Sequence, residues 1–263
     1  MRVLILNGSP RAERSNTLRI AKAFTDGFSS ATDVQTEIVH LYKQDIKPCM
    51  GCFSCWTKTP GRCVISDDMQ TLYGKIEAAD VIIESFPLYF FGMPSGFKAA
   101  VDRCLPFMKT YLGKQDSGGN TDVAKPPPKG RQDVSQQSGG ADSFHELRSE
   151  SMRGKKLVLI STCGYVDTPP MYPALLKQYD LICGEGNYTA ILCSEGELFG
   201  YDGLAERQKK GYLADVFKAG EEFAEHGKLS PETHAMLSKY VLSPSGFEAI
   251  VRSHWGGEQF PQI

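Results

Sequence analysis

Residues 3–17, VLILNGSPRAERSNT, decide the fold of this chain. Val3–Leu6 form a short, wholly apolar run of the kind found in a strand that is buried on both faces. The sequence Asn-Gly-Ser-Pro at 7–10 then stops the run. Residues 15–17, Ser-Asn-Thr, can cap a helix, and apolar side chains follow at helical spacing at 18, 21 and 24. The stretch therefore predicts a strand, a tight loop and a helix.

The loop in this stretch has the chemistry of a phosphate site. It directs backbone amides, hydroxyl groups and a helix N-terminus at one point, and Arg11 and Arg14 add positive charge. An ordinary turn between a strand and a helix is the alternative. Neither Gly-x-Gly-x-x-Gly nor Gly-x4-Gly-Lys-Ser/Thr occurs here, which argues against a dinucleotide fingerprint and a P-loop. A hydroxyl-rich loop for a mononucleotide fits what remains.

The rest of the chain alternates between short apolar runs and helix-like segments. Strand-like runs follow at 34–41, 80–86, 156–161 and 188–193, with helix-like segments at 69–79, 94–107 and 172–183. Strict alternation indicates an α/β protein with a parallel sheet and right-handed crossovers. We expect five strands in the order 2-1-3-4-5 with helices on both faces. That order places a ligand crevice at the carboxyl ends of strands 1 and 3.

Two further loops fall at the same predicted edge. The third strand runs into a loop with three successive aromatic residues between prolines, whose leading residues are Pro87, Leu88, Tyr89, Phe90, Phe91 and Gly92. Such a loop can present amides and aromatic faces to a ring system, or its aromatic residues can simply cap the core. The loop after the fourth strand contains Thr162, Cys163 and Gly164, whose amides and hydroxyl could bond a pyrimidine edge. A buried core thiol is the alternative for Cys163.

Four of the eight cysteines cluster between the second strand and its helix. Cys49, Cys52, Cys55 and Cys63 have the spacing C-x2-C-x2-C-x7-C. Three thiolates from such a turn can converge on one polynuclear centre, and a fourth can return through a Pro-Gly turn to complete the ligation of a [4Fe-4S] cluster. Tetrahedral zinc, a redox disulfide and unmetallated thiols are the alternatives.

These stretches resemble the flavodoxin-like NAD(P)H-dependent FMN reductases, and the cysteine motif resembles that of their iron-sulfur flavoprotein branch. The resemblance covers about residues 1–112 and 155–193. It implies that the FMN phosphate is held by Ser9, Arg11, Ser15, Asn16 and Thr17. It also implies that the loop 87–92 lies against the isoalloxazine and ribityl groups, and that the four clustered cysteines ligate the metal.

Length and composition bound the remaining questions. The chain has 263 residues, of which 41% are hydrophobic and 23% charged, and a net charge of −2. These values indicate a globular protein and argue against a nucleic-acid partner. We expect neither a signal peptide nor a membrane span, and therefore a cytoplasmic protein with reduced cysteines. A flavodoxin-like domain is expected at 1–200, with the cysteine loop at 48–63 and a low-complexity insertion at 113–152, and a helical extension at 201–263.

The predicted function is an FMN-dependent oxidoreductase that also carries a [4Fe-4S] cluster. Electrons would pass from NAD(P)H or ferredoxin through FMN to a small-molecule acceptor, in a homodimer or homotetramer. No side chain stands out as a catalytic acid or base, so the cofactors would perform the chemistry. The alternatives are a simple NAD(P)H-dependent FMN or quinone reductase without a cluster, a noncatalytic electron-transfer protein, and a zinc-stabilised binding module.

Overall fold

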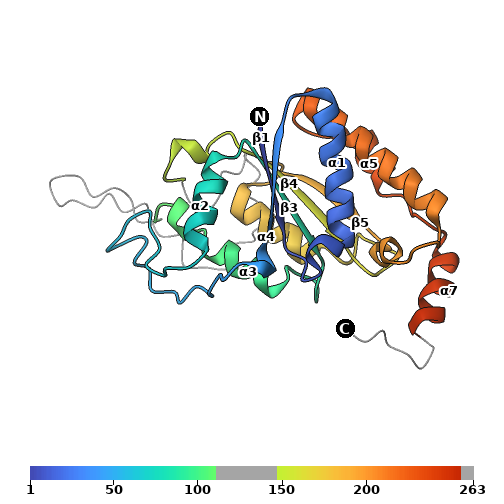
Figure 1. Ribbon diagram of the computed structural model, residues 1–263, viewed down its shortest axis with the longest axis horizontal. Coiled ribbons are helices and arrows are strands. Elements are labelled where there is room, and N and C mark those ends of the chain that lie inside the picture. Colours follow the sequence, from blue (N-terminus) through green and yellow to red (C-terminus); the bar gives the residue numbers. More distant parts are fainter. Residues whose placement is uncertain (111–146, 256–263) are drawn as a thin grey trace, which may run out of the picture.

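The computed structural model describes residues 1–110 and 147–255 (Figure 1). Its centre is a parallel sheet with the strand order β2-β1-β3-β4-β5, as predicted. The strands are β1 (Arg2–Asn7), β2 (Gln35–His40), β3 (Val81–Pro87), β4 (Lys156–Thr162) and β5 (Thr189–Cys193). The flavodoxin-like arrangement expected from the sequence is therefore confirmed.

Strand position explains the sequence pattern of each strand. β1 lies in the interior of the sheet, and every residue from Val3 to Asn7 is buried. β2 lies at the edge, and its first three residues are exposed. The register pairs Asn7 with His40 on one side and with Ser85 on the other, and Pro87 with Thr162. The carboxyl ends of the strands are thus aligned, so the loops that leave them meet at one edge.

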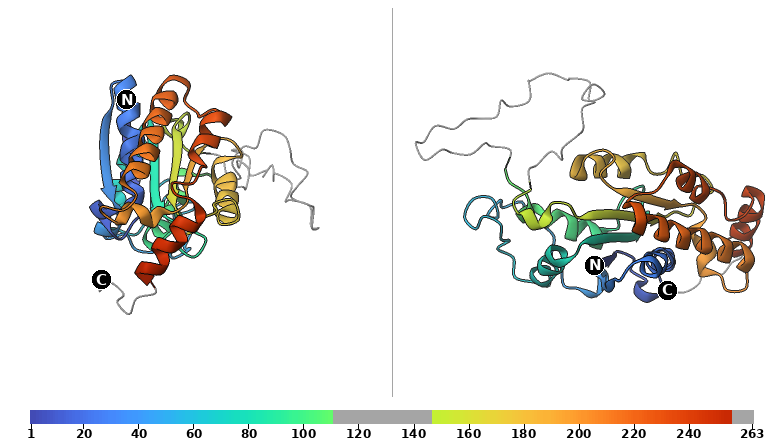
Figure 2. Two further views of the ribbon diagram at one scale, coloured as in Figure 1. Left: turned by 90° about the vertical axis from the view of Figure 1, so that its right-hand side faces the viewer. Right: turned by 90° about the horizontal axis from the view of Figure 1, so that it is seen from above.

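Helices cover both faces of the sheet (Figure 2). The helices α1 (Asn16–Ala31) and α5 (Glu206–His226) run side by side on one face and share a core with β1, β3, β4 and β5. The other face packs on α2 (Met69–Ala78), α3 (Ser95–Asp102) and α4 (Pro173–Cys183). Because α5 buries its apolar side against the sheet domain, the segment after residue 200 adds to the main core.

The helix expected at 94–107 is shorter in the structure. α3 ends at Asp102, and a separate 3-10 turn, η3 (Leu105–Phe107), follows it. Pro106 explains the break, because a proline inside an α-helix has no N–H to donate and clashes with the carbonyl group four residues earlier. Residues 103–108 therefore do not continue α3, and they contact the cysteine loop instead.

Two short helices complete the described chain. α6 (Pro231–Leu237) begins as the sequence indicates, because the Ser230 hydroxyl accepts a hydrogen bond from the amide of Thr233. α7 (Pro244–Trp255) follows it. Most of the expected insertion, from 113 to 146, lies outside the described residues. Within the part that is described, no helix is long and apolar enough to cross a membrane.

Candidate functional site

The loop after β1 is organised by Asn7, a residue that the sequence analysis did not single out. Its buried side-chain amide donates to the carbonyl oxygen of Ala12 at 2.9 Å and contacts the His40 ring nitrogen at 2.8 Å. Its carbonyl oxygen accepts from the amide of Ser9 at 3.2 Å. An asparagine at the end of a buried strand was the available signal, since a buried amide must find partners. Here those partners hold the turn closed.

The N-terminus of α1 points its first amides at this edge of the sheet. Ser15 is the N-cap, and its hydroxyl accepts a hydrogen bond from the Leu18 amide at 3.1 Å. The amides of Asn16 and Thr17 belong to the first turn, where a helix has no internal acceptor for them. Together with the positive end of the helix dipole they form an anion-binding point. Arg11, which is exposed, adds charge to it.

The side chains predicted to hold the phosphate mostly bind the protein itself. The Thr17 and Thr162 hydroxyl groups lie 2.7 Å apart, which joins the first loop to the third. Asn16 donates to the Gly196 carbonyl at 2.9 Å. The Ser9 hydroxyl accepts from the Arg11 amide at 3.3 Å. The predicted residues are therefore brought together, and among them the amides of Asn16 and Thr17 and the side chain of Arg11 are the groups that can meet a ligand.

The aromatic loop forms a tight turn that projects from the edge. The amide of Leu88 donates to Thr162 at 2.7 Å, and Tyr89 and Gly92 exchange two backbone hydrogen bonds of 3.0 Å. Phe90 and Phe91, between them, have φ angles of 46° and 62°, a left-handed conformation that is strained for phenylalanine. Phe90 is 98% exposed. The turn thus holds aromatic rings in the solvent beside the first loop.

The third loop faces the aromatic loop. Tyr165 stacks against Phe91 with ring centroids 6.1 Å apart, and Gly164 beside it is exposed. Thr162 and Cys163 are buried, and burial raises the pKa of the Cys163 thiol. The edge therefore combines anion-binding amides, an arginine and open aromatic faces, which is the set of groups that a phosphate joined to a flat ring requires. The residues present fit FMN.

The cysteine loop lies next to the aromatic loop and α3. Cys55 is buried, Cys52 is exposed, and Cys49 and Cys63 are half-buried. Burial raises the pKa of Cys55, and the charges of the other three thiols raise it further, so the four groups are electrostatic neighbours. Hydrogen bonds from the Ser54 hydroxyl and amide lower the pKa of Cys52. Four thiols in one loop are a suitable donor set for iron or zinc.

The thiols do not converge on one point in the structure. Among the residues that are described, no three His, Cys, Asp or Glu side chains lie close enough together to hold a metal ion. A cavity of about 500 Å³ is lined by Cys49 and Gly51 from the cysteine loop and by Met93 from the end of the aromatic loop. The two loops therefore share a boundary, as the order of the strands predicts.

Comparison with known proteins agrees with this geometry. The family model described as NADPH-dependent FMN reductase matches residues 1–116. An iron-sulfur flavoprotein of Methanocaldococcus jannaschii is 31% identical over 137 residues, which are 52% of this chain and 69% of that protein. The chain belongs to this family, in its iron-sulfur flavoprotein branch.

Other relatives match this chain over a smaller share of their own length or have a lower sequence identity to it. An iron-sulfur flavoprotein of Methanosarcina thermophila is 33% identical over 103 residues, 39% of this chain and 52% of that protein. The solved structure of an NAD(P)H:quinone oxidoreductase from Methanothermobacter marburgensis superposes with a TM-score of 0.52. It is 18% identical over 85% of this chain and 96% of that chain, a likeness that shows the fold. As a member of the family, the chain is a flavin-dependent oxidoreductase.

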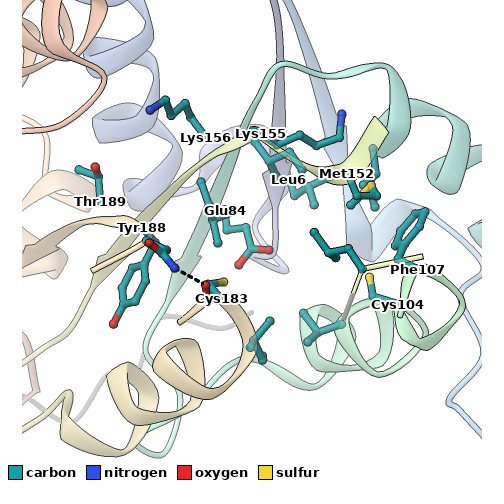
Figure 3. A pocket seen from close by; sticks show the side chains of 18 of the residues that line it. Leu6, Glu84, Cys104, Phe107, Met152, Lys155, Lys156, Cys183, Tyr188 and Thr189 are labelled. Carbon is teal, nitrogen blue, oxygen red and sulfur yellow. Dashed lines mark hydrogen bonds between the residues drawn. The ribbon is translucent and has the colours of Figure 1, made fainter. Parts of the chain in front are cut away.

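In this family member a second cavity lies away from the three loops. Its volume is about 810 Å³, and it lies between the sheet, the end of α3 and the end of α4 (Figure 3). Glu84, from the middle of β3, projects into it. The Tyr179 hydroxyl donates to the carboxylate of Glu84, and burial raises the pKa of Glu84 to about 7. The pKa values of Cys104 and Cys183 are both raised to about 12. Burial is the main cause, and the negative charge of Glu84 is the second.

Proposed function

We propose that this protein passes electrons from NAD(P)H or ferredoxin through bound FMN to a small-molecule acceptor, and that Cys49, Cys52, Cys55 and Cys63 hold a [4Fe-4S] cluster. The observation that carries the proposal is the meeting of three loops, from β1, β3 and β4, at one edge beside the cysteine loop. The exposed aromatic turn and the helix amides have no role in the packing of the core, which supports a ligand there.

Each part of the edge has a distinct task in this proposal. The amides of Asn16 and Thr17, with Arg11, bind and orient the phosphate, and the hydrogen bond between Thr17 and Thr162 keeps the first and third loops at a constant separation. The rings of the aromatic loop and Tyr165 exclude water from one side of the isoalloxazine. Bound FMN supplies both hydride and single-electron transfer, which would let it exchange electrons with a one-electron cluster.

The four thiols of the cysteine loop are a donor set that suits an iron-sulfur cluster. The boundary that this loop shares with the aromatic loop supports electron transfer between such a cluster and FMN. Cys49 lines the same cavity as Met93, so a metal group held by the loop would lie beside the aromatic loop. The alternative is a simple FMN or quinone reductase in which the cysteines are structural or bind zinc. Because the thiols do not converge in the structure, the test measures metal directly.

The test is an absorption spectrum of anaerobically purified protein, with flavin, iron, sulfide and zinc assays on the same sample. We expect flavin together with about four iron and four sulfide per chain. Cys63→Ser should remove most of the iron and keep the flavin. Cys104→Ser, a half-buried cysteine outside the loop, is the matched control and should keep both.

Other outcomes would select the alternatives. Flavin without iron would leave a simple reductase, and a colourless protein with zinc would indicate a binding module. Failure to oxidise NAD(P)H, with rapid oxidation of reduced ferredoxin, would assign ferredoxin as the donor. The small-molecule acceptor, the cytoplasmic location and the assembly as a homodimer or homotetramer stay predictions.

A further inference from the structure

The base of the cysteine loop is closed by paired backbone segments. The Asp45 amide donates to the Asp68 carboxylate at 2.7 Å, and the Asp68 amide donates to the Asp45 carbonyl at 3.1 Å. The Lys47 amide donates to the Asp67 carboxylate at 2.9 Å. The chain therefore enters and leaves the loop side by side, just outside the outer cysteines Cys49 and Cys63.

One buried arginine binds both sides of this base. Arg103 follows α3, and its two terminal guanidinium nitrogens bind the two carboxylate oxygens of Asp67 at 2.8 and 3.0 Å. The same nitrogens donate to the carbonyl oxygen of Lys47 at 2.8 Å and to that of Ile65 at 3.4 Å. The side chains of Arg103 and Asp67 are both fully buried. A single guanidinium group thus joins three parts of the chain: the segment that enters the cysteine loop, the segment that leaves it, and the end of α3.

The far part of the loop is attached to the same segment. The indole nitrogen of Trp56 donates to the carbonyl oxygens of Leu105 and Met108, both at 3.1 Å. α3 begins at Ser95, directly after the aromatic loop, and ends beside Arg103. An eight-residue helix is a rigid rod of about 12 Å. Residues 95–108 therefore connect the predicted flavin edge to the base of the cysteine loop and to its far part around Trp56.

Stability alone does not explain a buried ion pair at this place. Removing two charges from water is costly, and well-packed apolar side chains often stabilise a fold as well or better. The ion pair instead sets the orientation of the segments that it joins, because a planar guanidinium group can bind several acceptors in a defined geometry. Such a pair is expected where the fold must hold two segments in one relative position.

We propose that Arg103 and Asp67 are positioning residues, which close the cysteine loop and hold its four thiols in place relative to the aromatic loop. The pair acts on the loop itself, whichever metal the thiols bind. The proposal rests on the proposed function only for the statement that the thiols serve a cofactor. Its test can therefore be made on the metal-free protein, where failure of the cluster assignment does not affect the result.

The test is the rate at which iodoacetamide alkylates each cysteine of the metal-free folded protein, resolved by mass spectrometry. In the unaltered protein we expect Cys52 to react first, since it is exposed, and Cys55 to react last among the four, since it is buried. Arg103→Lys keeps the charge but cannot bind all four acceptors at once. It should raise the rate at Cys55 about tenfold, as expected when a local closed state loses its restraint.

Two further variants separate positioning from stability. The double variant Arg103→Met with Asp67→Leu removes both charges, so neither is left buried alone. Its overall stability should be close to that of the unaltered protein, and alkylation of Cys55 should still be about tenfold faster. Lys98→Met breaks the exposed pair between Lys98 and Asp102 on the same helix and is the matched control, expected to change no rate. Buried Cys193 reports global opening and should stay slow.

Three results would overturn the proposal. The first is a Cys55 rate within about twofold of the unaltered protein in every folded variant. The second is an equal rise at Cys55 and Cys193, which would mean that the whole protein opens. The third is that Arg103→Lys and the double variant both unfold, since the pair would then determine the whole fold and not the position of the loop.

Discussion

At the residue scale, the carboxyl group of Glu84 has an environment that shifts its pKa far from that of a free acid. It lies on a central strand, accepts a hydrogen bond from Tyr179 and faces a large, mainly apolar cavity (Figure 3). Burial disfavours the charged form, and the pKa therefore rises from 4.5 to about 7. The folded protein keeps a proton on this residue that the unfolded chain would release between these two values.

This difference predicts that Glu84 makes the protein less stable as the pH rises. Between about pH 4.5 and 7 the folded state binds one more proton than the unfolded state, so the free energy of unfolding falls by up to about 1.4 kcal/mol per pH unit from this residue. Glu84→Gln cannot ionise. It should match the unaltered protein near pH 4.5 and be more stable at pH 8, by as much as about 3 kcal/mol. Urea denaturation at both pH values measures this.

The control for Glu84 is an exposed acid. Glu248→Gln, on the surface of α7, should leave the pH dependence of unfolding unchanged. A difference between Glu84→Gln and the unaltered protein that is equal at pH 4.5 and at pH 8 would contradict the assignment, because it would reflect packing and not ionisation.

At the scale of elements, the contact between α1 and α5 depends on two glycines. A Cβ atom on Gly27 would lie 1.9 Å from the Phe217 carbonyl oxygen, and one on Gly220 would lie 2.0 Å from the Phe24 carbonyl oxygen. Both partners are backbone atoms, which cannot turn aside as a flexible side chain can. The two helices can approach this closely only because each has no side chain at the crossing.

Gly220→Ala should therefore destabilise the protein although alanine is the better helix former. Separating the helices would open the core beneath them, and we expect a loss of about 2 to 4 kcal/mol in the free energy of unfolding. Gly211→Ala, on the same helix, is the control, because its Cβ would meet nothing within 4 Å. It should gain about 0.5 to 1 kcal/mol from helix propensity. Chemical denaturation of both variants checks the opposite signs.

If Gly220→Ala were as stable as the control variant, the close crossing of α1 and α5 would not exist in solution. The test bears on the site as well, because the N-terminus of α1 supplies the anion-binding amides. A shift of α1 along the sheet would move those amides away from the third loop.

At the scale of the whole molecule, the candidate site is assembled from segments that are far apart in the sequence. Residues 9–17, 87–92 and 162–165 meet because β1, β3 and β4 are parallel neighbours whose carboxyl ends are in register. Between the second and third of these segments the chain makes α3, η3 and a return to the amino end of β4. A ligand that contacts all three loops would restrain them together.

Addition of FMN to the flavin-free protein should slow amide hydrogen exchange in all three segments at once. Binding to the folded state alone raises stability by an amount that depends on ligand concentration, so the protection should increase with FMN until the site is saturated. α6 packs on α5 and β5 and serves as the internal control, with no early change expected. Protection of only one segment would contradict a shared site, and equal protection of α6 would indicate a global effect.

The sequence by itself determined the sheet and the edge at which the three loops meet. The apolar run at Val3–Leu6, the stop at 7–10 and the cap at Ser15 act within a few residues of one another, and the structure agrees with each. The alternation of strands and helices predicted a parallel sheet, and the expected order 2-1-3-4-5 placed the three loops at one edge. Local periodicity and turn chemistry are properties of a short window of chain, so they can be read without the fold.

Only the tertiary structure showed which distant residues contact one another. Glu84 is the single charged residue of its strand, and its role is hidden until Tyr179 is placed against it; Gly220 is an ordinary helix glycine until it meets Phe24. Arg103 connects Lys47, Ile65 and Asp67 across tens of residues of sequence. These contacts depend on how the crossovers bring helices to the sheet. No short window of the chain contains both partners, and that is why the packing of the folded chain decided them.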